Sequence, residues 1–203
     1  MFGVGEDMKI DELVKLIKET SATRKFDKTH VDAHCLKKIT EAGQWSLSIH
    51  TVQPWSIIVV RNKKTIEDIA LACSKASSVL YHGFRQILAS TSETIRNSRT
   101  IIVVLNKQPF SMRAKRFGRK YQNVVKNAEV QCIAAFVQNM NLAISSLDLK
   151  SVWLTSCIFA ENEIKRILAA NGELIAILCV GFSKENVKRS KRNKVNDFVS
   201  YIL

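Results

Sequence analysis

Proline and glycine are scarce in this chain of 203 residues, which holds two prolines and seven glycines. No low-complexity linker and no internal repeat interrupts the sequence. The glycines at positions 3 and 5 have no strand before them, so they are not a dinucleotide-binding fingerprint. Aromatic residues make up 7% of the chain, and none of its strands has the aromatic pattern of an RNA-binding motif. These observations argue against a dinucleotide-binding domain of the Rossmann type and against an RNA-recognition motif.

The five cysteines are scattered, with no CxxC pair and no regular spacing. An odd, dispersed set is typical of reduced thiols in a reducing compartment. His30 and His34 lie four residues apart, but no carboxylate or cysteine is placed to complete a metal site with them. Acidic residues stand near the N-terminus where a signal peptide would have its apolar core. The longest charge-free run, 130–147, contains too many amides and serines to span a bilayer. We therefore expect a cytoplasmic protein without a metal or a membrane partner.

Acidic residues are few relative to basic ones: 18 against 31, a net charge of +13. The excess is concentrated in two segments, an excursion at about 110–126 and a C-terminal tail at about 184–203. Such runs occur on solvated surfaces and on surfaces that bind nucleic acid, anionic lipid or a phosphorylated ligand. Because zinc-finger spacing and a helix-turn-helix are both missing, a nucleic-acid partner is poorly supported.

Hydrophobic periodicity predicts a mixture of helices and strands. Helices are expected at about 9–19, 32–44, 63–77, 128–147 and 160–170, and strands at 56–60, 99–106, 150–157 and 173–182. Asp32 is expected to cap the second helix, with Leu36 and Ile39 facing inward. The helix at 128–147 is apolar nearly all round, which indicates a central position or one between two subunits. Without regular βαβ alternation, the order predicts an α+β layer fold in one domain spanning 1–203.

The connection into the first strand contains Gln53-Pro54-Trp55. A plain turn needs only glycine, asparagine or aspartate, whereas this connection is rigid, aromatic and carries a glutamine that looks buried. The strand at 56–60 is itself β-branched and apolar, which predicts that it is buried. This pattern indicates that the connection holds a ligand.

Five segments occur along the chain in this order: "TSATRKF", "SLSIHTVQPWSIIVV", "FVQNMNLAISSLDLKSVWLTS", "GELIAILCVGFSKE" and "KRSKRNKVNDFV". Their order resembles that of the flavin-dependent nitroreductase family across nearly the whole chain. The family has Arg-Arg-Ser-x-Arg-x-Phe, Ala-Pro-Ser-x-x-Asn-x-Gln-Pro-Trp and Gly-Leu-Gly-x-x-Trp-Leu-Gly in the first three. This chain departs from those motifs in each. Thr20, Ser21 and Ala22 replace Arg-Arg-Ser, Thr51 replaces the asparagine, and 148–150 lacks both glycines.

The resemblance implies a nitroreductase-like three-layer fold: a central, mainly antiparallel sheet flanked by helices, with FMN at a homodimer interface. The implied cofactor-binding residues are Thr20, Ser21, Ala22, Arg24, Ser48, Thr51, Gln53, Trp153, Leu154, Thr155 and Arg192. Arg24 and Arg192 are the candidates for the FMN phosphate, because a guanidinium donates two charge-assisted hydrogen bonds to such a dianion. Gln53 is the candidate for the flavin ring or the ribityl chain.

The function implied is an FMN-dependent oxidoreductase that passes reducing equivalents from NAD(P)H to a nitroaromatic, quinone or similar small-molecule acceptor. No acid–base residue is assigned, because the flavin performs the chemistry. Two alternatives stay open: a degenerate family member that binds flavin with little turnover, which the missing arginines and glycines favour, and a basic nucleic-acid-associated protein.

Overall fold

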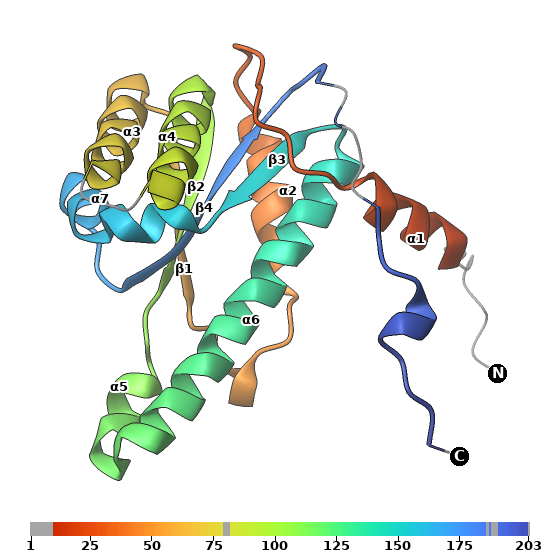
Figure 1. Ribbon diagram of the computed structural model, residues 1–203, viewed down its shortest axis with the longest axis vertical. Helices are drawn as coiled ribbons and strands as arrows, with labels where there is room; N and C mark the ends of the chain where they lie inside the picture. The colour runs from red at the N-terminus through yellow and green to blue at the C-terminus, as the bar shows by residue number, and fades with distance from the viewer. Residues whose placement is uncertain (1–9, 79–81, 186, 188–190, 203) are drawn as a thin grey trace.

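A four-stranded antiparallel sheet forms the centre of the molecule in the computed structural model, which describes residues 10–78, 82–185, 187 and 191–202. The strands are β1 (Trp55–Val60), β2 (Thr100–Asn106), β3 (Lys150–Leu154) and β4 (Glu173–Gly181), in the spatial order β1-β2-β4-β3 (Figure 1). Every neighbouring pair is antiparallel. The predicted α+β fold with a central antiparallel sheet is confirmed.

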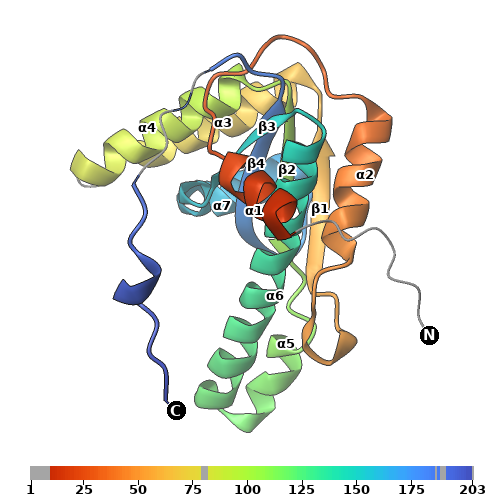
Figure 2. The same cartoon turned by 90° about the vertical axis from the view of Figure 1, so that its right-hand side faces the viewer.

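Helices cover both faces of this sheet and make three layers (Figures 1 and 2). One face carries α2 (Ala33–Gln44) and α6 (Arg119–Ser146), and the other carries α3 (Lys63–Ser77), α4 (His82–Asn97) and α7 (Glu161–Leu168). The remaining helical elements are α1 (Ile10–Glu19), α5 (Ser111–Ala114), η1 (Ile49–Thr51), η2 (Lys115–Phe117), η3 (Ser156–Ala160) and η4 (Val195–Asp197).

The alternation of side chains along β2 divides the core in two. Ile101 and Val103 face the α3 side, whereas Ile102 and Val104 face α2 and α6. All of β2 is buried, as expected for a central strand covered on both faces. The Asp32 carboxylate accepts a hydrogen bond from the His34 N–H and caps α2, so this prediction is confirmed.

The structure corrects two predictions around the first strand. The strand 56–60 was expected to be buried, but β1 lies at the sheet edge, where Val59 is 37% exposed and only Val60 of these five residues is buried. A run of apolar residues is consistent with a strand buried on both faces, but it does not reveal whether a second neighbour strand exists. Gln53 is exposed rather than buried, while Pro54 and Trp55 are buried.

The long helix α6 also differs from its prediction. It begins at Arg119 instead of about residue 128, so it includes the second half of the basic excursion. Only one face is buried; Gln131 and Gln138 are exposed. Gly43 of α2 allows the close approach of the two helices, since a Cβ there would lie 2.8 Å from the Phe136 ring. The Phe136 ring in turn stacks on Trp55 with centroids 4.9 Å apart.

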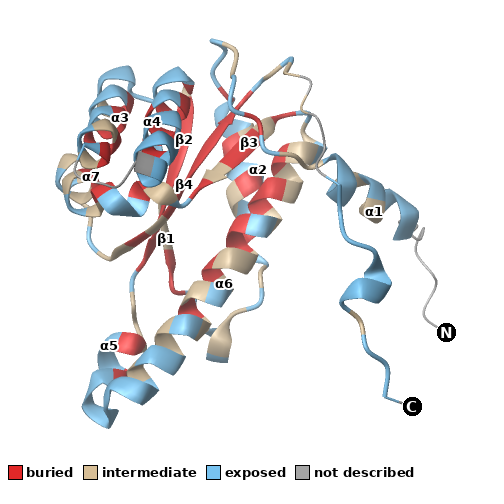
Figure 3. Ribbon diagram, in the orientation of Figure 1, coloured by how far each residue is buried: buried red, intermediate tan, exposed pale blue. Residues whose placement is uncertain are grey.

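Both ends of the described chain project from the body (Figures 1 and 2). α1 is amphipathic, as predicted, yet it buries no residue, and Ile10 is 69% exposed. The C-terminal tail, 191–202, exposes Phe198, Tyr201 and Ile202 (Figure 3). Apolar side chains are therefore exposed on both of these terminal segments.

Among the described residues, no helix is both long and apolar enough to cross a membrane. The same residues contain no cluster of three or more histidine, cysteine or acidic side chains that could hold a metal ion.

Candidate functional site

The segment after α1 runs beside β3 and extends the sheet. Ala22 forms a parallel bridge with Ser151, and the Thr23 N–H donates to the Ser151 carbonyl at 3.0 Å. The Ser151 hydroxyl donates to the Asn141 side-chain oxygen of α6 at 2.8 Å. This arrangement places the "TSATRKF" segment next to β3, although the two are about 130 positions apart in sequence.

The chain leaving β4 fixes the far end of the same segment. The Glu185 carboxylate accepts hydrogen bonds from the backbone N–H groups of Arg24 and Lys25 at 3.0 and 3.2 Å. The Asp27 N–H donates to the Phe182 carbonyl at 2.8 Å. Because Glu185 binds only the backbone of Arg24, the guanidinium stays available for another anion.

A cavity of about 410 Å³ lies beside this guanidinium, and we call it the Arg24 cavity. Its lining residues come from three segments of the chain: Arg24, Gln86, Ile87, Ser90, Thr91, Trp153, Leu154, Thr155 and Ser156. No carboxylate is among them, so the guanidinium gives the lining a net positive charge. Four of the residues that the sequence predicted to bind a cofactor therefore meet in one cavity.

Sequence reasoning missed the contribution of α4. Ser90 and Thr91 line the cavity, and the Thr91 and Ser156 hydroxyls lie 2.6 Å apart. The signal that could have found them is the run "ASTSET" at 89–94, since small hydroxyl residues are poor helix formers that occur where a helix packs closely or binds through its hydroxyls. Ser92, in the same run, is buried and donates to the Ala70 carbonyl at 2.7 Å.

The Trp153 side chain packs on the α2 and α6 side of the sheet and carries an unpaired donor there. Its indole Nε1 is buried, and it has no hydrogen-bond partner within the described part of the chain. A buried N–H without a partner costs about 1–3 kcal/mol. Such a group is a candidate for pairing with a bound molecule or an ordered water.

The backbone at Asp148 keeps the conformation that suits the glycine found there in the third motif. Asp148 stands at that position with φ 56°, the left-handed conformation that glycine adopts most easily. The Asp148 N–H donates to the Ser145 carbonyl and the Leu149 N–H to the Ile144 carbonyl, which is the hydrogen-bond pattern of a Schellman cap on α6. This chain therefore keeps the backbone shape without the glycine.

Four other predicted residues are not brought into the Arg24 cavity. The Thr20 hydroxyl lies 2.9 Å from the Ser145 hydroxyl and 3.0 Å from the Leu16 carbonyl, so it is engaged within the fold. Ser21 is half-buried and Ala22 is exposed beside β3. Arg192 is exposed in the C-terminal tail, and it has no hydrogen-bond or ion-pair partner among the described residues.

Ser48, Thr51 and Gln53 form a second group, on the other side of the sheet. They belong to the loop 48–53, which lies against α6, where the Ile49 N–H donates to the Cys132 sulfur at 3.1 Å. His50 and Thr51 have φ of 46° and 57°. Two consecutive non-glycine residues in the left-handed region cost on the order of 1–3 kcal/mol each, which is typical of a loop with a function.

Within a single chain, the loop 48–53 and the Arg24 cavity lie far apart. β1, which the loop precedes, and β3, which leads into the Arg24 cavity, are the opposite edges of the sheet. Three strand spacings separate these edges, about 14 Å. The Gln53 side chain lines a separate groove between α2 and β1.

Comparison with protein families gives a match to the Nitroreductase family over residues 17–182. The chain belongs to the nitroreductase family. No match was found among curated proteins.

Solved structures share the fold. A BluB-like flavoprotein from Clostridium difficile 630 superposes with a TM-score of 0.82 at 21% identity, covering 94% of this chain and 98% of that one. A nitroreductase with bound FMN from Bacteroides fragilis superposes with a TM-score of 0.73 at 18% identity, covering 94% of this chain and 98% of that one. An NADPH:FMN oxidoreductase from Vibrio harveyi complexed with NAD+ superposes with a TM-score of 0.73 at 16% identity, covering 93% of this chain and 76% of that one. The nitroreductase fold predicted from the sequence motifs is confirmed.

Proposed function

We propose that this protein is an FMN-dependent oxidoreductase that takes reducing equivalents from NAD(P)H and passes them to a small acceptor such as a nitroaromatic or a quinone. The observation that carries this proposal is the Arg24 cavity, where Arg24 meets Trp153, Leu154 and Thr155. These residues belong to two separate motifs of the nitroreductase family, and the fold brings them together at one site.

The residues of the cavity fit FMN in charge and in polarity. FMN carries a phosphate dianion, and the free Arg24 guanidinium can donate two charge-assisted hydrogen bonds to it. Ser90 and Thr155 add hydroxyls to the lining. The volume falls within the usual range for small-molecule sites. Arg24 would hold the phosphate, and 153–155 would contact the rest of the cofactor, which when bound supplies the hydride chemistry.

A homodimer completes the proposed site. In one chain the loop with Ser48, Thr51 and Gln53 is on the opposite side of the sheet from Arg24, so it serves a second copy rather than its own cavity. The exposed apolar side chains of α1 and of the C-terminal tail supply surface for such a contact. Arg192, which lies in that tail, would bring a second cation to the phosphate. We also propose a cytoplasmic location, which the five free cysteines support.

The test is an absorption spectrum of the purified protein, followed by chromatography of the acid-released cofactor. We expect flavin bands, released FMN, a dimer by light scattering, and oxidation of NADH or NADPH when a nitroaromatic is added. Released FAD would contradict the FMN assignment. A colourless protein that leaves the fluorescence of added FMN unquenched would refute the proposal.

The same preparation separates the alternatives. Bound FMN without NAD(P)H oxidation would assign the protein as a flavin binder with little turnover. Co-purifying nucleic acid in a colourless preparation, seen in the ratio of absorbances, would instead assign the basic surface to nucleic acid.

A further inference from the structure

Glu185 lies between the end of β4 and the C-terminal tail that carries Arg192, and it is half-buried. One of its carboxylate oxygens, Oε2, accepts hydrogen bonds from the backbone N–H groups of both Arg24 and Lys25, at 3.0 and 3.2 Å. Two consecutive N–H groups that converge on one anion form an anion-binding nest. In this chain the nest beside the Arg24 cavity is therefore occupied by the protein's own carboxylate.

The segment that carries Arg24 is attached to the fold on both sides of this arginine. On the N-terminal side, the Thr23 N–H donates to a carbonyl of β3 at 3.0 Å. On the C-terminal side, the Phe26 ring packs so closely on Gly181 that a Cβ on this glycine would lie 3.2 Å from the ring. Only two residues remain between these anchors, and Glu185 binds the backbone N–H of each. Glu185 therefore completes the attachment at the residue whose guanidinium lines the cavity.

The Glu185 carboxylate contacts the backbone of this segment and leaves its side-chain cations available. Among the described residues, Glu185 forms no ion pair with the Arg24 or Lys25 side chain. The lining of the Arg24 cavity includes Arg24 but neither Lys25 nor Glu185. Glu185 therefore does not occupy the place of a ligand in the cavity. This arrangement favours a role in placing the arginine over a role as an internal competitor of the phosphate.

The direction of the Arg24 guanidinium matters because Arg24 is the one cationic residue in the lining of the cavity. A guanidinium binds phosphate best through two parallel hydrogen bonds, which require its plane to be aligned with the phosphate oxygens. Arg24 is exposed, so burial does not hold it in one orientation. Contacts of its backbone have to provide that support, and the contact with Glu185 provides it at the residue itself.

We infer that Glu185 is a positioning residue for the FMN phosphate: by accepting both hydrogen bonds of the nest, it holds the Arg24 guanidinium at the cavity. Glu185 acts through Arg24 and does not touch the cofactor. The acceptor oxygen carries this role and the negative charge does not, since a single oxygen receives both hydrogen bonds. The inference rests on the proposed function, because it requires the Arg24 cavity to bind the phosphate.

The experiment compares FMN with riboflavin, which has the same ring and ribityl chain but no phosphate. Each is titrated into cofactor-free wild type and Glu185→Ala, and quenching of flavin fluorescence is followed. The alanine removes the acceptor, so FMN binding should weaken at least about fivefold, whereas riboflavin affinity should stay within about twofold because riboflavin has no phosphate for Arg24. An equal loss for both flavins would indicate general damage to the fold and would overturn the inference. Tighter FMN binding would overturn it too, because Glu185 would then be a competitor of the phosphate.

Glu185→Gln separates the acceptor from the charge. Its amide oxygen can accept from both N–H groups as Oε2 does, so FMN should bind within about twofold of the wild-type affinity, or more tightly because a nearby carboxylate repels phosphate. A loss as large as that in Glu185→Ala would contradict the acceptor role. Glu19→Ala is the matched control, since it removes an exposed negative charge at the end of α1, beside the same segment, without removing an acceptor of the nest. It should bind FMN like the wild type.

Hydrogen exchange of the cofactor-free protein gives a second readout, which needs no flavin. The amides of Arg24 and Lys25 should exchange faster in Glu185→Ala than in the wild type, and at the wild-type rate in Glu185→Gln. Unchanged exchange in Glu185→Ala would show that the carboxylate does not hold the segment. Wild-type protein that binds no FMN would refute the proposed function and this inference with it. Wild-type protein that binds FMN no better than Glu185→Ala does would refute this inference alone.

Discussion

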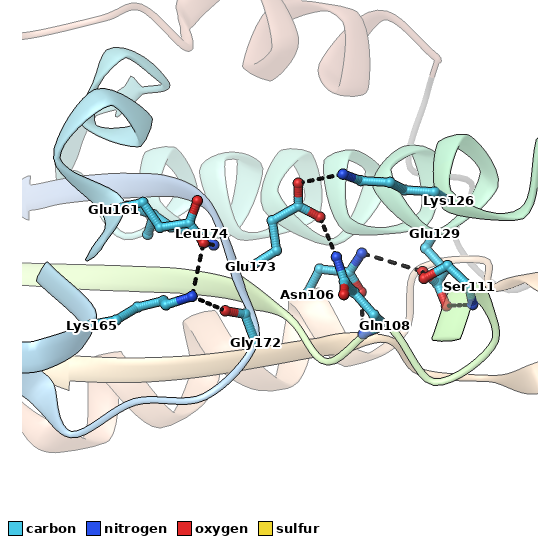
Figure 4. Close-up of polar contacts among 10 residues, drawn as sticks. All are labelled: Asn106, Gln108, Ser111, Lys126, Glu129, Glu161, Lys165, Gly172, Glu173 and Leu174. Atoms are coloured by element: carbon cyan, nitrogen blue, oxygen red, sulfur yellow. Dashed lines mark hydrogen bonds and ion pairs between the residues drawn. The ribbon is translucent and has the colours of Figure 1, made fainter. Parts of the chain in front are cut away.

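The hydroxyl of Ser111 donates a hydrogen bond of 2.7 Å to the buried carboxylate of Glu129, and this joins α5 to α6 across 18 positions of the chain. Glu129 accepts from three further donors in the same place. Glutamine can keep one oxygen for the N–H groups of Phe110 and Ser111, but its NH2 then faces the Ser111 hydroxyl and the Asn106 amide, which donate to the second oxygen (Figure 4). We expect Glu129→Gln to lower the free energy of unfolding by about 2–3 kcal/mol, measured by urea denaturation. Gln131→Ala, exposed on the same helix, should change it by less than about 0.5 kcal/mol; similar values for both would contradict the structural role of Glu129.

Two helical glycines should respond to alanine with opposite signs. In Gly43→Ala the new Cβ lies 2.8 Å from the Phe136 ring and 2.9 Å from Met140, and Phe136 cannot retreat because it stacks on Trp55. We expect a loss of about 1–3 kcal/mol from overpacking. At Gly83 a Cβ would meet nothing within 4 Å, so Gly83→Ala should gain up to about 1 kcal/mol of helix propensity. Thermal denaturation of the two variants measures both signs, and a stabilised Gly43→Ala would show that α2 and α6 pack less closely.

Asp148 is expected to be a site of mild backbone strain. A non-glycine residue in the left-handed region costs about 1–2 kcal/mol, and glycine recovers this at an entropic cost of about 0.5–1 kcal/mol. Asp148→Gly should therefore stabilise the protein by about 0.5–1 kcal/mol, whereas Asp148→Ala should destabilise it. The comparison uses chemical denaturation midpoints. A destabilised glycine variant would mean that the aspartate side chain itself matters at the α6 cap.

Because three cysteines are buried, we expect the free energy of unfolding to fall at alkaline pH. Burial raises the pKa of Cys73 to about 12 and that of Cys179 to about 12, and it also raises the pKa of Cys157. An unfolded thiol titrates near about 8.5. Between these pH values the thiols of the unfolded chain have lost protons that the folded chain keeps. The contribution of these thiols to the free energy of unfolding is therefore fully present below about pH 8.5 and is lost as the pH rises toward 12.

Urea denaturation at a series of alkaline pH values measures this slope. Cys179→Ala should make the slope shallower, because one of the buried thiols is gone. Cys35→Ala, at a half-buried position, should affect it less. An identical slope in the wild type and in Cys179→Ala would contradict this account of the alkaline transition.

Much of the fold could be predicted from the sequence because its signals are local. The cap at Asp32 and the inward-facing Leu36 and Ile39 were sufficient to predict α2. The apolar runs were sufficient to predict β2 and β4. The start of α6 could not be predicted, since its first turns carry charged and polar residues without an apolar stripe. These turns are joined to the body through the buried Glu129, and a single acidic residue in a sequence gives no sign of burial.

The candidate site was predictable only in part, for a related reason. Motif order placed Arg24 and Thr155 in one site, but the α4 residues Ser90 and Thr91 belong to no motif and were found only through the fold. Gln53 looked buried because its neighbours Pro54 and Trp55 are buried, yet it points into an open groove. Sequence motifs also did not indicate that Arg24 and the loop 48–53 lie near opposite edges of the sheet in one chain.

We propose that the Arg24 cavity holds the FMN phosphate. Titration of cofactor-free protein with FMN, followed by quenching of flavin fluorescence, tests this assignment most directly. Arg24→Ala should weaken FMN binding by at least about tenfold, the equivalent of about 1.4 kcal/mol, and Arg192→Ala should do the same because the tail brings the second cation to the phosphate. Added salt should weaken wild-type binding, because a partly exposed phosphate site is screened. Arg61→Ala, an exposed arginine after β1, is the matched control and should bind FMN like the wild type. Equal FMN affinity in the wild type and in Arg24→Ala would contradict the account.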